Sequence, residues 1–402
     1  MKTKMKFLVL CLTFFCLIYL IPIDSHAAAV RGVTADTIKL GLIVPLTGPT
    51  AFHGRMAADG CINYFKWVND QGGIHGRKIE IITEDGGAVP AKAMLAAQKL
   101  VFRDEVFAIP IIWFSEAVLS LEAFIEQNQL ITFPGTYSKF VTHPPRKYVF
   151  STGPYLEDEA RVGIDYVMRD LKMKIQKIGM ISLPGVSGKS YLDGAKQQAK
   201  KYNLEIVGYH EIPTDSIDYS APILNLRKEN ADLVMLYLVP PPANLALREA
   251  QKLLWRPLFL GAWPSSQDKV VELAGEAAEG MYATRGFALP SYEGVPGLER
   301  VREVLKKYPI GKPIEVIPDN YTFSWVNAMV LTEGLKRAGK DLTPDKVVKA
   351  LEGLKDFPTG DICGPVTYGQ NQRGSGARIH IIKADVKNKR FVPVTGWRSP
   401  EE

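Results

Sequence analysis

Cysteine is scarce in this sequence, and the few cysteines present lack metal-binding or redox spacing. Two of the four lie in the first 28 residues, which leaves Cys61 and Cys363. No Cys-x-x-Cys pair occurs, and the six histidines are scattered along the chain. We therefore expect no metal site and no cofactor. A disulfide between Cys61 and Cys363 and a pair of free buried thiols both stay open.

Long apolar runs are absent beyond the N-terminus. Phe7 to Ile23 is apolar, follows three lysines and precedes Ser25-His26-Ala27, a small-x-small pattern. These features predict a cleaved secretory signal peptide over residues 1–28, with an uncleaved anchor helix as the alternative. No later apolar stretch is long enough to span a bilayer.

The chain also lacks any block of like charge. Its formal net charge of +6 falls to +4 without the predicted signal peptide, because three lysines and Asp24 leave with it. Without a run of lysine and arginine, nothing favours a nucleic-acid partner. At 402 residues the chain is long enough to hold more than one hydrophobic core.

The signatures of two enzyme classes are incomplete. Leu183 to Gly194 contains Gly-Lys-Ser after a strand-like run, but a phosphate-binding loop needs a glycine where Leu183 stands. No Gly-x-Ser-x-Gly elbow occurs, so no motif marks Ser115, Ser187 or Ser190 as a nucleophile. We expect a strand-to-helix loop here, with Ser190 as the helix N-cap, and no enzyme.

Strand-like apolar runs alternate with amphipathic helix-like runs along most of the chain. The first series, from Ile38 to Pro134, contains four strands ("IKLGLIV", "KIEIIT", "VFAIPII", "QLITFP") with a helix-like run between each pair. Such strict alternation predicts a parallel, doubly wound sheet. A second series of the same kind runs from Lys177 to Ala262.

We therefore predict two Rossmann-like α/β lobes joined by a hinge, with the first join near Lys147 to Ala160. Two more helices, within residues 320–339 and 345–354, precede two or three antiparallel C-terminal strands. Pro- and Gly-rich breaks at Thr284 to Gly297 and Thr359 to Pro365 are the predicted crossing points. These features give lobe one as residues 29–152 and 288–361, and lobe two as residues 153–287 and 362–402.

Ligands of open α/β sheets bind beyond the carboxyl ends of the strands, beside helix N-termini that offer free N–H groups. Two lobes whose strand ends face each other form a cleft, and a hinge can close it over a small molecule. The loops at these ends are predicted at residues 45–54, 111–118, 132–140, 183–190, 236–243 and 261–268.

The stretches "IKLGLIVPLTGPTAFHGRMAADG", "VNDQGGIHGRKIEIITEDGG", "AGEAAEGMYAT" and "GPVTYGQNQRG" carry a family resemblance that covers nearly all of the chain after the signal peptide. The chain resembles the periplasmic solute-binding proteins of branched-chain amino acid ABC transporters. The resemblance implies the type I periplasmic binding fold, capture of a small molecule in the periplasm, and delivery to an ABC permease without catalysis. We expect a monomer. A sensor that acts on a signalling receptor is the alternative.

The family's ligand contacts carry over to lobe one position by position. The Ser or Thr that holds the ligand carboxylate in this family corresponds to Phe114, with Ser115 beside it. The backbone carbonyl and the Thr of the next loop correspond to Gly135 and Tyr137, with Thr136 between them. The resemblance therefore implies ligand contacts at these five residues.

In the remaining loops, the residues at the matched positions differ further from those of the family. The acidic residue that binds the ligand ammonium group corresponds to Trp263. Positions that are aromatic in the family fall near His53, Ser187 and Val239, with Tyr237 close by. We include these residues among the predicted ligand contacts.

None of the matched positions is acidic, and a buried ammonium group without a partner is costly. Phe114, Tyr137, Tyr237 and Trp263 instead supply flat apolar area with a few polar tips. We therefore predict an aromatic or apolar small molecule, such as a carboxylate held by backbone N–H groups, Ser115 and His53. A true branched-chain amino acid ligand is the alternative.

Overall fold

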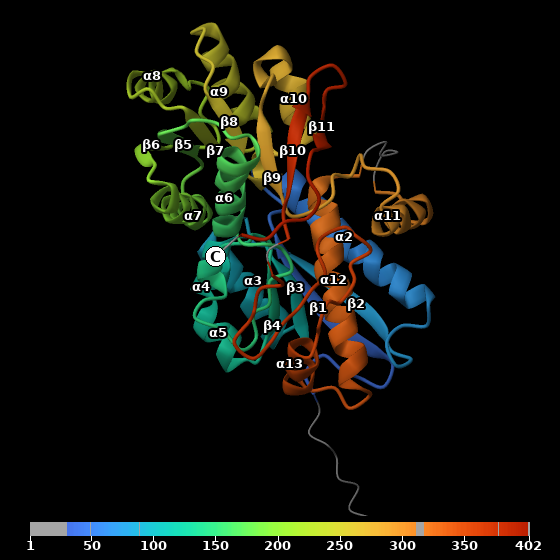
Figure 1. Ribbon diagram of the computed structural model, residues 1–402. Helices are drawn as coiled ribbons and strands as arrows, with labels where there is room; N and C mark the ends of the chain where they lie inside the picture. The colour runs from blue at the N-terminus through green and yellow to red at the C-terminus, as the bar shows by residue number, and fades with distance from the viewer. Residues whose placement is uncertain (1–29, 49, 88, 311–316, 377, 401–402) are drawn as a thin grey trace, which may run out of the picture.

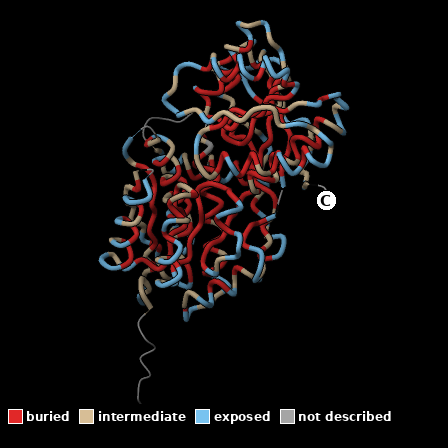
Figure 2. Tube along the Cα trace, turned by 90° about the vertical axis from the view of Figure 1, so that its left-hand side faces the viewer, coloured by how far each residue is buried: buried red, intermediate tan, exposed pale blue. Residues whose placement is uncertain are grey.

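The computed structural model describes residues 30–48, 50–87, 89–310, 317–376 and 378–400, so the predicted signal peptide lies outside the described residues. The described chain forms two lobes, each built around one β-sheet with helices against it (Figure 1). Buried residues fill both lobes, and most exposed residues lie on outer turns and helices (Figure 2). The predicted α/β fold with two doubly wound lobes is confirmed.

Lobe one is built around a four-stranded parallel sheet. Its first elements are β1 (Thr37–Val44), α2 (Ala51–Asp70), β2 (Lys78–Asp85), α3 (Pro90–Phe102), β3 (Ala108–Ile112), α4 (Ser115–Ser120), α5 (Glu122–Gln127) and β4 (Ile131–Pro134). The strand order is β2-β1-β3-β4. Strands β3 and β4 are buried along their whole length, as expected for parallel strands covered on both faces.

Lobe two contains a seven-stranded sheet in the order β11-β10-β9-β8-β7-β5-β6. Strands β5 to β9 are parallel, whereas β10 is antiparallel to both β9 and β11. Its elements are α6 (Leu156–Asp165), the π-helical η3 (Tyr166–Asp170), β5 (Lys177–Ser182), α7 (Val186–Tyr202), β6 (Glu205–Glu211), α8 (Ser220–Lys228), β7 (Leu233–Tyr237), α9 (Pro240–Lys252), β8 (Leu258–Gly261), η4 (Trp263–Ser265), α10 (Asp268–Ala274), η5 (Gly275–Ala278), β9 (Tyr282–Arg285), β10 (His380–Asp385) and β11 (Arg390–Pro393).

Three helices between β9 and β10 return to lobe one: α11 (Pro296–Lys307), α12 (Asp319–Ala338) and α13 (Pro344–Glu352). Helix α12 packs along α2, and α11 also contacts α2 (Figure 1). The two long helices lie very close at Gly60, where an added Cβ would overlap the Tyr321 carbonyl and the Ser324 hydroxyl. The chain therefore crosses between the lobes more than once, and the exact lobe boundaries stay a prediction.

One local expectation was wrong. Ser190 is not the N-cap of α7, because that helix begins at Val186 and its N-cap residue is Gly185, so Ser190 lies inside the helix. The helix-like run between the third and fourth strands forms two short helices, α4 and α5, with Leu121 between them. In addition, α6 begins inside Lys147 to Ala160, the segment that the sequence predicted only as the join between the lobes.

Candidate ligand-binding site

The loops that follow β3 and β4 in lobe one contact those that follow β5 and β8 in lobe two. The Ser138 and Ser190 hydroxyls are 2.5 Å apart, and the Val186 N–H donates to Glu116 Oε1 at 2.8 Å. The Tyr137 and Trp263 rings lie edge to face with their centroids 6.1 Å apart. Carboxyl ends of strands from both sheets thus meet in one region, where a ligand of this fold class is expected.

Five rings from distant segments form what we call the ring cluster: Trp113, Tyr137, Trp263, Phe287 and Phe323. Tyr137 stacks on Phe287 at 5.5 Å and is also edge to face with Phe323 at 6.2 Å. Phe323 in turn contacts Trp113 and Trp263, both with centroids 5.7 Å apart. Since Trp263 belongs to lobe two and Trp113, Tyr137 and Phe323 to lobe one, the cluster spans both lobes.

The predicted contacts of lobe one lie beside this cluster. The Ser115 and Thr136 hydroxyls are 2.5 Å apart, and the Ser115 side chain is fully buried. The Gly135 N–H donates to Ile112, and a Cβ at Gly135 would press on the Trp113 backbone. Phe114 is only partly buried, and its ring lies edge to face with Trp113 at 5.9 Å. The structure thus brings five of the predicted residues together, while contact with a ligand stays a prediction.

In lobe two, Ser187 occupies the first turn of α7 and Tyr237 ends β7. Burial raises the pKa of the Tyr237 hydroxyl, opposed by the neighbouring Ser187 hydroxyl and supported by the Glu116 and Glu159 charges. The Tyr191 ring lies 6.2 Å from that of Tyr237. Ser187 and Tyr237 are therefore neighbours, as the loop positions predict.

The other two predicted contacts lie at helix starts. His53 is in the first turn of α2, and its Nδ1 lies 2.6 Å from the side-chain amide nitrogen of Asn320 at the start of α12. Val239 is the partly buried N-cap residue of α9. That helix opens with three prolines, so its first turn offers no N–H group to an anion.

A carboxyl group that the sequence did not indicate lies directly behind Trp263. Glu159 Oε2 accepts hydrogen bonds from the backbone N–H of Trp263 at 2.8 Å and from the Thr284 hydroxyl at 3.3 Å. Burial raises the pKa of Glu159 to about 8, although these hydrogen bonds and the nearby Arg285 act in the opposite direction. Glu159 is therefore mostly neutral at pH 7 and is not a fixed anion for an ammonium group.

Glu116 is a second acidic residue that the position matching missed. It follows Ser115 in the first turn of α4, is partly buried, and accepts the Val186 N–H of lobe two. Its place next to a predicted contact was the only signal in the sequence. Phe287 and Phe323 were missed because they lie in a predicted crossing segment and inside a helix.

Outside the ring cluster and its neighbours, the two cysteines of the described chain are the next groups to consider. Cys61 and Cys363 are both buried and unpaired, and burial raises the pKa of each thiol. No cluster of His, Cys, Asp and Glu among the described residues is arranged to hold a metal ion. No helix within the described ranges is long and apolar enough to cross a membrane.

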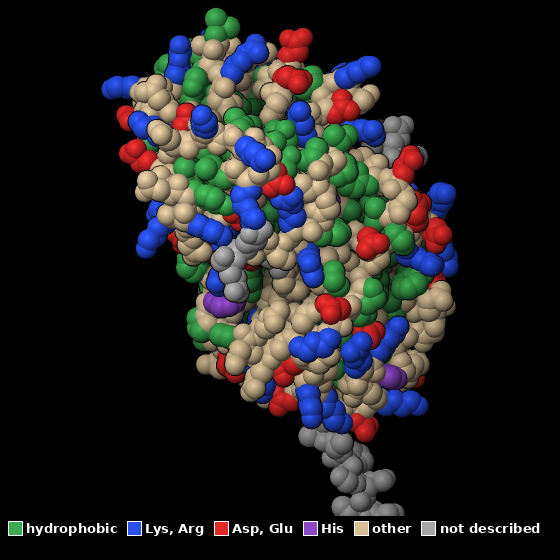
Figure 3. All heavy atoms as spheres, in the orientation of Figure 1, with side chains coloured by type: hydrophobic (Ala, Val, Ile, Leu, Met, Phe, Trp, Pro, Cys, Tyr) green, Lys and Arg blue, Asp and Glu red, His purple; other side chains and the backbone are tan. Residues whose placement is uncertain are grey.

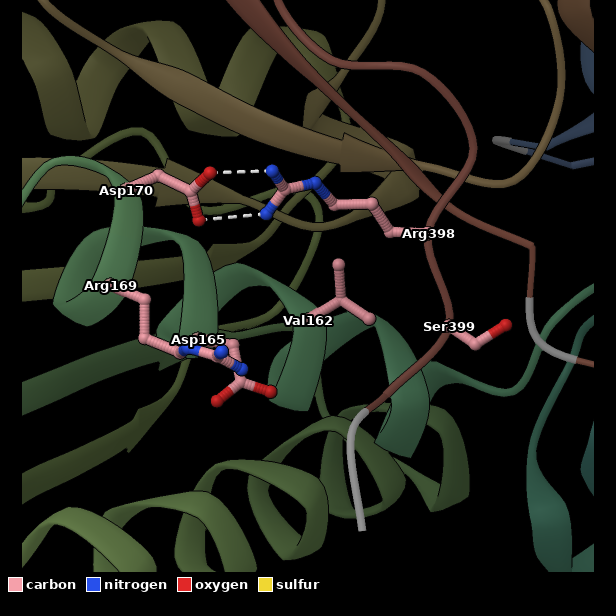
Figure 4. A pocket seen from close by; sticks show the side chains of 6 residues that line it. All are labelled: Val162, Asp165, Arg169, Asp170, Arg398 and Ser399. Carbon is pink, nitrogen blue, oxygen red and sulfur yellow. Dashed lines mark hydrogen bonds and ion pairs between the residues drawn. The ribbon is translucent and has the colours of Figure 1, made fainter.

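A hollow of about 450 Å³ lies elsewhere on lobe two, between α6, η3 and the C-terminal tail (Figure 4). There the Arg398 guanidinium binds the Asp170 carboxylate through two contacts of 2.8 and 2.5 Å. None of the predicted ligand contacts lines this hollow. On the face shown in Figure 3, Lys and Arg side chains are scattered among Asp and Glu.

Comparison with known proteins places this architecture in a family. A family model described as periplasmic binding protein matches residues 37–387. The chain belongs to the periplasmic binding protein family. This membership confirms the resemblance seen in the sequence and indicates a location in the periplasm.

Relatives within this family are similar over most of their length. A Leu/Ile/Val-binding protein homolog of Brucella melitensis is 26% identical over 348 residues, which cover 87% of this chain and 91% of the relative. The leucine-specific-binding protein of Salmonella typhimurium is 26% identical over 360 residues, or 89% and 93% of the two chains.

Two solved structures of ABC transporter proteins are similar to this chain over most of its length. A fatty acid ABC transporter substrate-binding protein from Thermomonospora curvata is 25% identical, with a TM-score of 0.81 over 93% of this chain and 95% of the other. A branched-chain amino acid ABC transporter protein from Thermus thermophilus, with bound valine, has a TM-score of 0.82 over 91% and 97%. The latter is 23% identical and shows the shared fold alone.

Proposed function

We propose that this periplasmic binding protein is the solute-binding component of an ABC importer and carries an apolar or aromatic carboxylate rather than an α-amino acid. It is exported through a cleaved signal peptide, binds its ligand between the lobes as a monomer, and delivers it to a permease in the cytoplasmic membrane. It performs no catalysis. The ligand contacts are the ten predicted residues together with Phe287 and Phe323.

The ring cluster is the observation that carries this proposal. Trp263 stands where the family resemblance implies an acidic partner for an ammonium group, and its ring packs against Tyr137 and Phe323. Aromatic rings favour apolar ligands and offer an ammonium group only the attraction of a ring face, not the anionic partner that a buried zwitterion needs. The fatty acid binding named for the Thermomonospora curvata protein supports an apolar carboxylate as a ligand class within this architecture.

The two carboxyl groups near the cluster also support this ligand class. Glu159 is engaged by the Trp263 N–H and the Thr284 hydroxyl, and its raised pKa keeps it mostly neutral. Glu116 is engaged by the Val186 N–H. Neither group is placed as an unpaired anion that awaits a ligand cation.

Amino acid binding is the second candidate, because several relatives are named for leucine, isoleucine and valine. In that case we expect Glu116 to pair with the ligand ammonium group. It would have to give up or share its hydrogen bond with Val186. That exchange lowers the affinity expected for an amino acid.

A thermal-shift panel tests the proposal. Apolar and aromatic carboxylates at 100 times their Kd should stabilise the protein by about 2.7 kcal/mol and raise its Tm by several degrees. Leucine, isoleucine and valine should leave the Tm within a degree or so of the ligand-free value. A large shift with these three amino acids and none with the carboxylates would favour the second candidate.

A further inference from the structure

Helix α7 receives no cap from its own lobe. Its N-cap residue is Gly185, and its first turn contains no Asp or Glu. The first N–H groups of a helix have no intrahelical partner, and a nearby negative charge stabilises them. Lys200 and Lys201 complement the opposite end of the helix, so only the N-terminal end needs a group from elsewhere.

Glu116 of lobe one supplies that group. Its Oε1 accepts the Val186 N–H at 2.8 Å, and the two residues belong to helices attached to different sheets. Helices α4 and α7 are in contact at this point, at the left of Figure 1. One turn further along α7, Ser190 meets Ser138 of lobe one with their hydroxyls 2.5 Å apart.

Gly185 allows the carboxylate to approach this closely. Its φ is +117°, a backbone conformation that residues with a Cβ rarely adopt. A Cβ built there would lie 2.6 Å from Glu116 Oε1, well inside van der Waals contact. The contact between the lobes therefore depends both on the Glu116 carboxylate of lobe one and on the absence of a side chain at Gly185 of lobe two.

We propose that Glu116 is a positioning residue, which caps α7 across the lobes and stabilises a closed arrangement, with the lobes in contact as in this structure, before a ligand arrives. Replacing a helix N-cap group by alanine changes an equilibrium by about fivefold, the equivalent of ~1 kcal/mol. A ligand that binds only the closed arrangement loses affinity by up to the same factor, and by the full factor when the closed form is the minor population. This effect on affinity rests on the proposed function, whereas the contact between the lobes does not.

Pulsed electron spin resonance on the ligand-free protein tests the proposal. Spin labels at Leu95→Cys on α3 and Leu224→Cys on α8 report the distance between the lobes, since both positions are exposed and Cys61 and Cys363 are buried. Glu116→Ala should raise the ratio of open to closed protein about fivefold. Glu116→Gln keeps an acceptor oxygen and should restore most of the closed population. Gly185→Ala should act in the same direction as Glu116→Ala.

Glu122→Ala is the matched control. Glu122 lies on α5 of the same lobe and pairs with Arg146 at 2.8 Å, so its removal deletes an acidic residue without touching α7. The control should keep the distance distribution of the unaltered protein. An identical distribution in Glu116→Ala and Glu122→Ala would overturn the proposal. Because no ligand is present, this failure is distinguishable from a wrong assignment of ligand class.

Discussion

Trp263 joins the two lobes through its ring and connects to the interior of lobe two through its backbone. The ring contacts Tyr137 and Phe323, and the N–H is held by Glu159. A side chain fixed in this way loses little conformational freedom when a ligand packs against it. Trp263 is therefore expected to dominate the affinity.

Trp263→Ala should weaken binding of the preferred carboxylate roughly 30-fold, for a loss of about 2 kcal/mol, because it removes the indole ring that η4 of lobe two contributes to the ring cluster. Titration calorimetry measures the loss. Trp255→Ala is the matched control, since Trp255 precedes β8 at the opposite end from Trp263. Equal affinity losses in both variants would show that Trp263 acts only through stability.

The raised pKa of Glu159 predicts that the stability of the folded protein depends on pH. Burial raises its pKa to about 8 from an ordinary value of 4.5, so the folded protein holds a proton that the unfolded chain releases over this range. Stability from this group is fully present below pH 4.5 and is lost as the pH rises through about 8. Glu157, whose pKa burial raises to about 7, acts in the same direction.

Glu159→Gln should therefore flatten the fall in Tm between pH 5 and pH 9 while preserving an oxygen that can accept the Trp263 N–H. Thermal unfolding followed by circular dichroism across that range measures the slope. The slope that remains should include Glu157 together with Asp158 and Asp59, whose pKa values burial also raises. An unchanged slope in Glu159→Gln would contradict the assignment of a raised pKa to Glu159.

At the scale of elements, the close packing of α2 on α12 attaches the returning segment to lobe one. Gly60→Ala should destabilise the protein by roughly 1–3 kcal/mol, since the added methyl group overlaps the Tyr321 carbonyl and the Ser324 hydroxyl. Urea unfolding detects this as a lower midpoint. Gly353→Ala is the control, because its nearest neighbour lies at 3.5 Å, and its midpoint should be unchanged.

The element pattern was largely predictable because β-branched apolar runs and helical spacing are local properties of the sequence. Helix starts were harder. Ser190 has the side chain of an N-cap, yet α7 begins four residues earlier, where Glu116 from the other lobe takes the capping role. A cap supplied from a residue 70 positions away leaves no local signal in the sequence.

At the scale of the whole molecule, the ring cluster shows what position matching can and cannot recover. Trp263 and Tyr137 follow strand ends, so their meeting could be anticipated from the order of strands. Phe287 lies on a segment that crosses between the lobes, and Phe323 lies within α12. Their arrival beside Tyr137 depends on how α12 docks on lobe one, which only the tertiary structure reveals.

The most direct test of the ligand class uses pairs of molecules that differ only in the α-amino group: 3-phenylpropanoate against phenylalanine, and 4-methylpentanoate against leucine. Titration calorimetry on the unaltered protein gives both affinities in each pair. Since neither Glu116 nor Glu159 is placed as an unpaired anion for an ammonium group, the molecule without the amino group should bind at least tenfold more tightly in the preferred pair. Tighter binding of leucine or phenylalanine than of its amino-free counterpart would contradict the account.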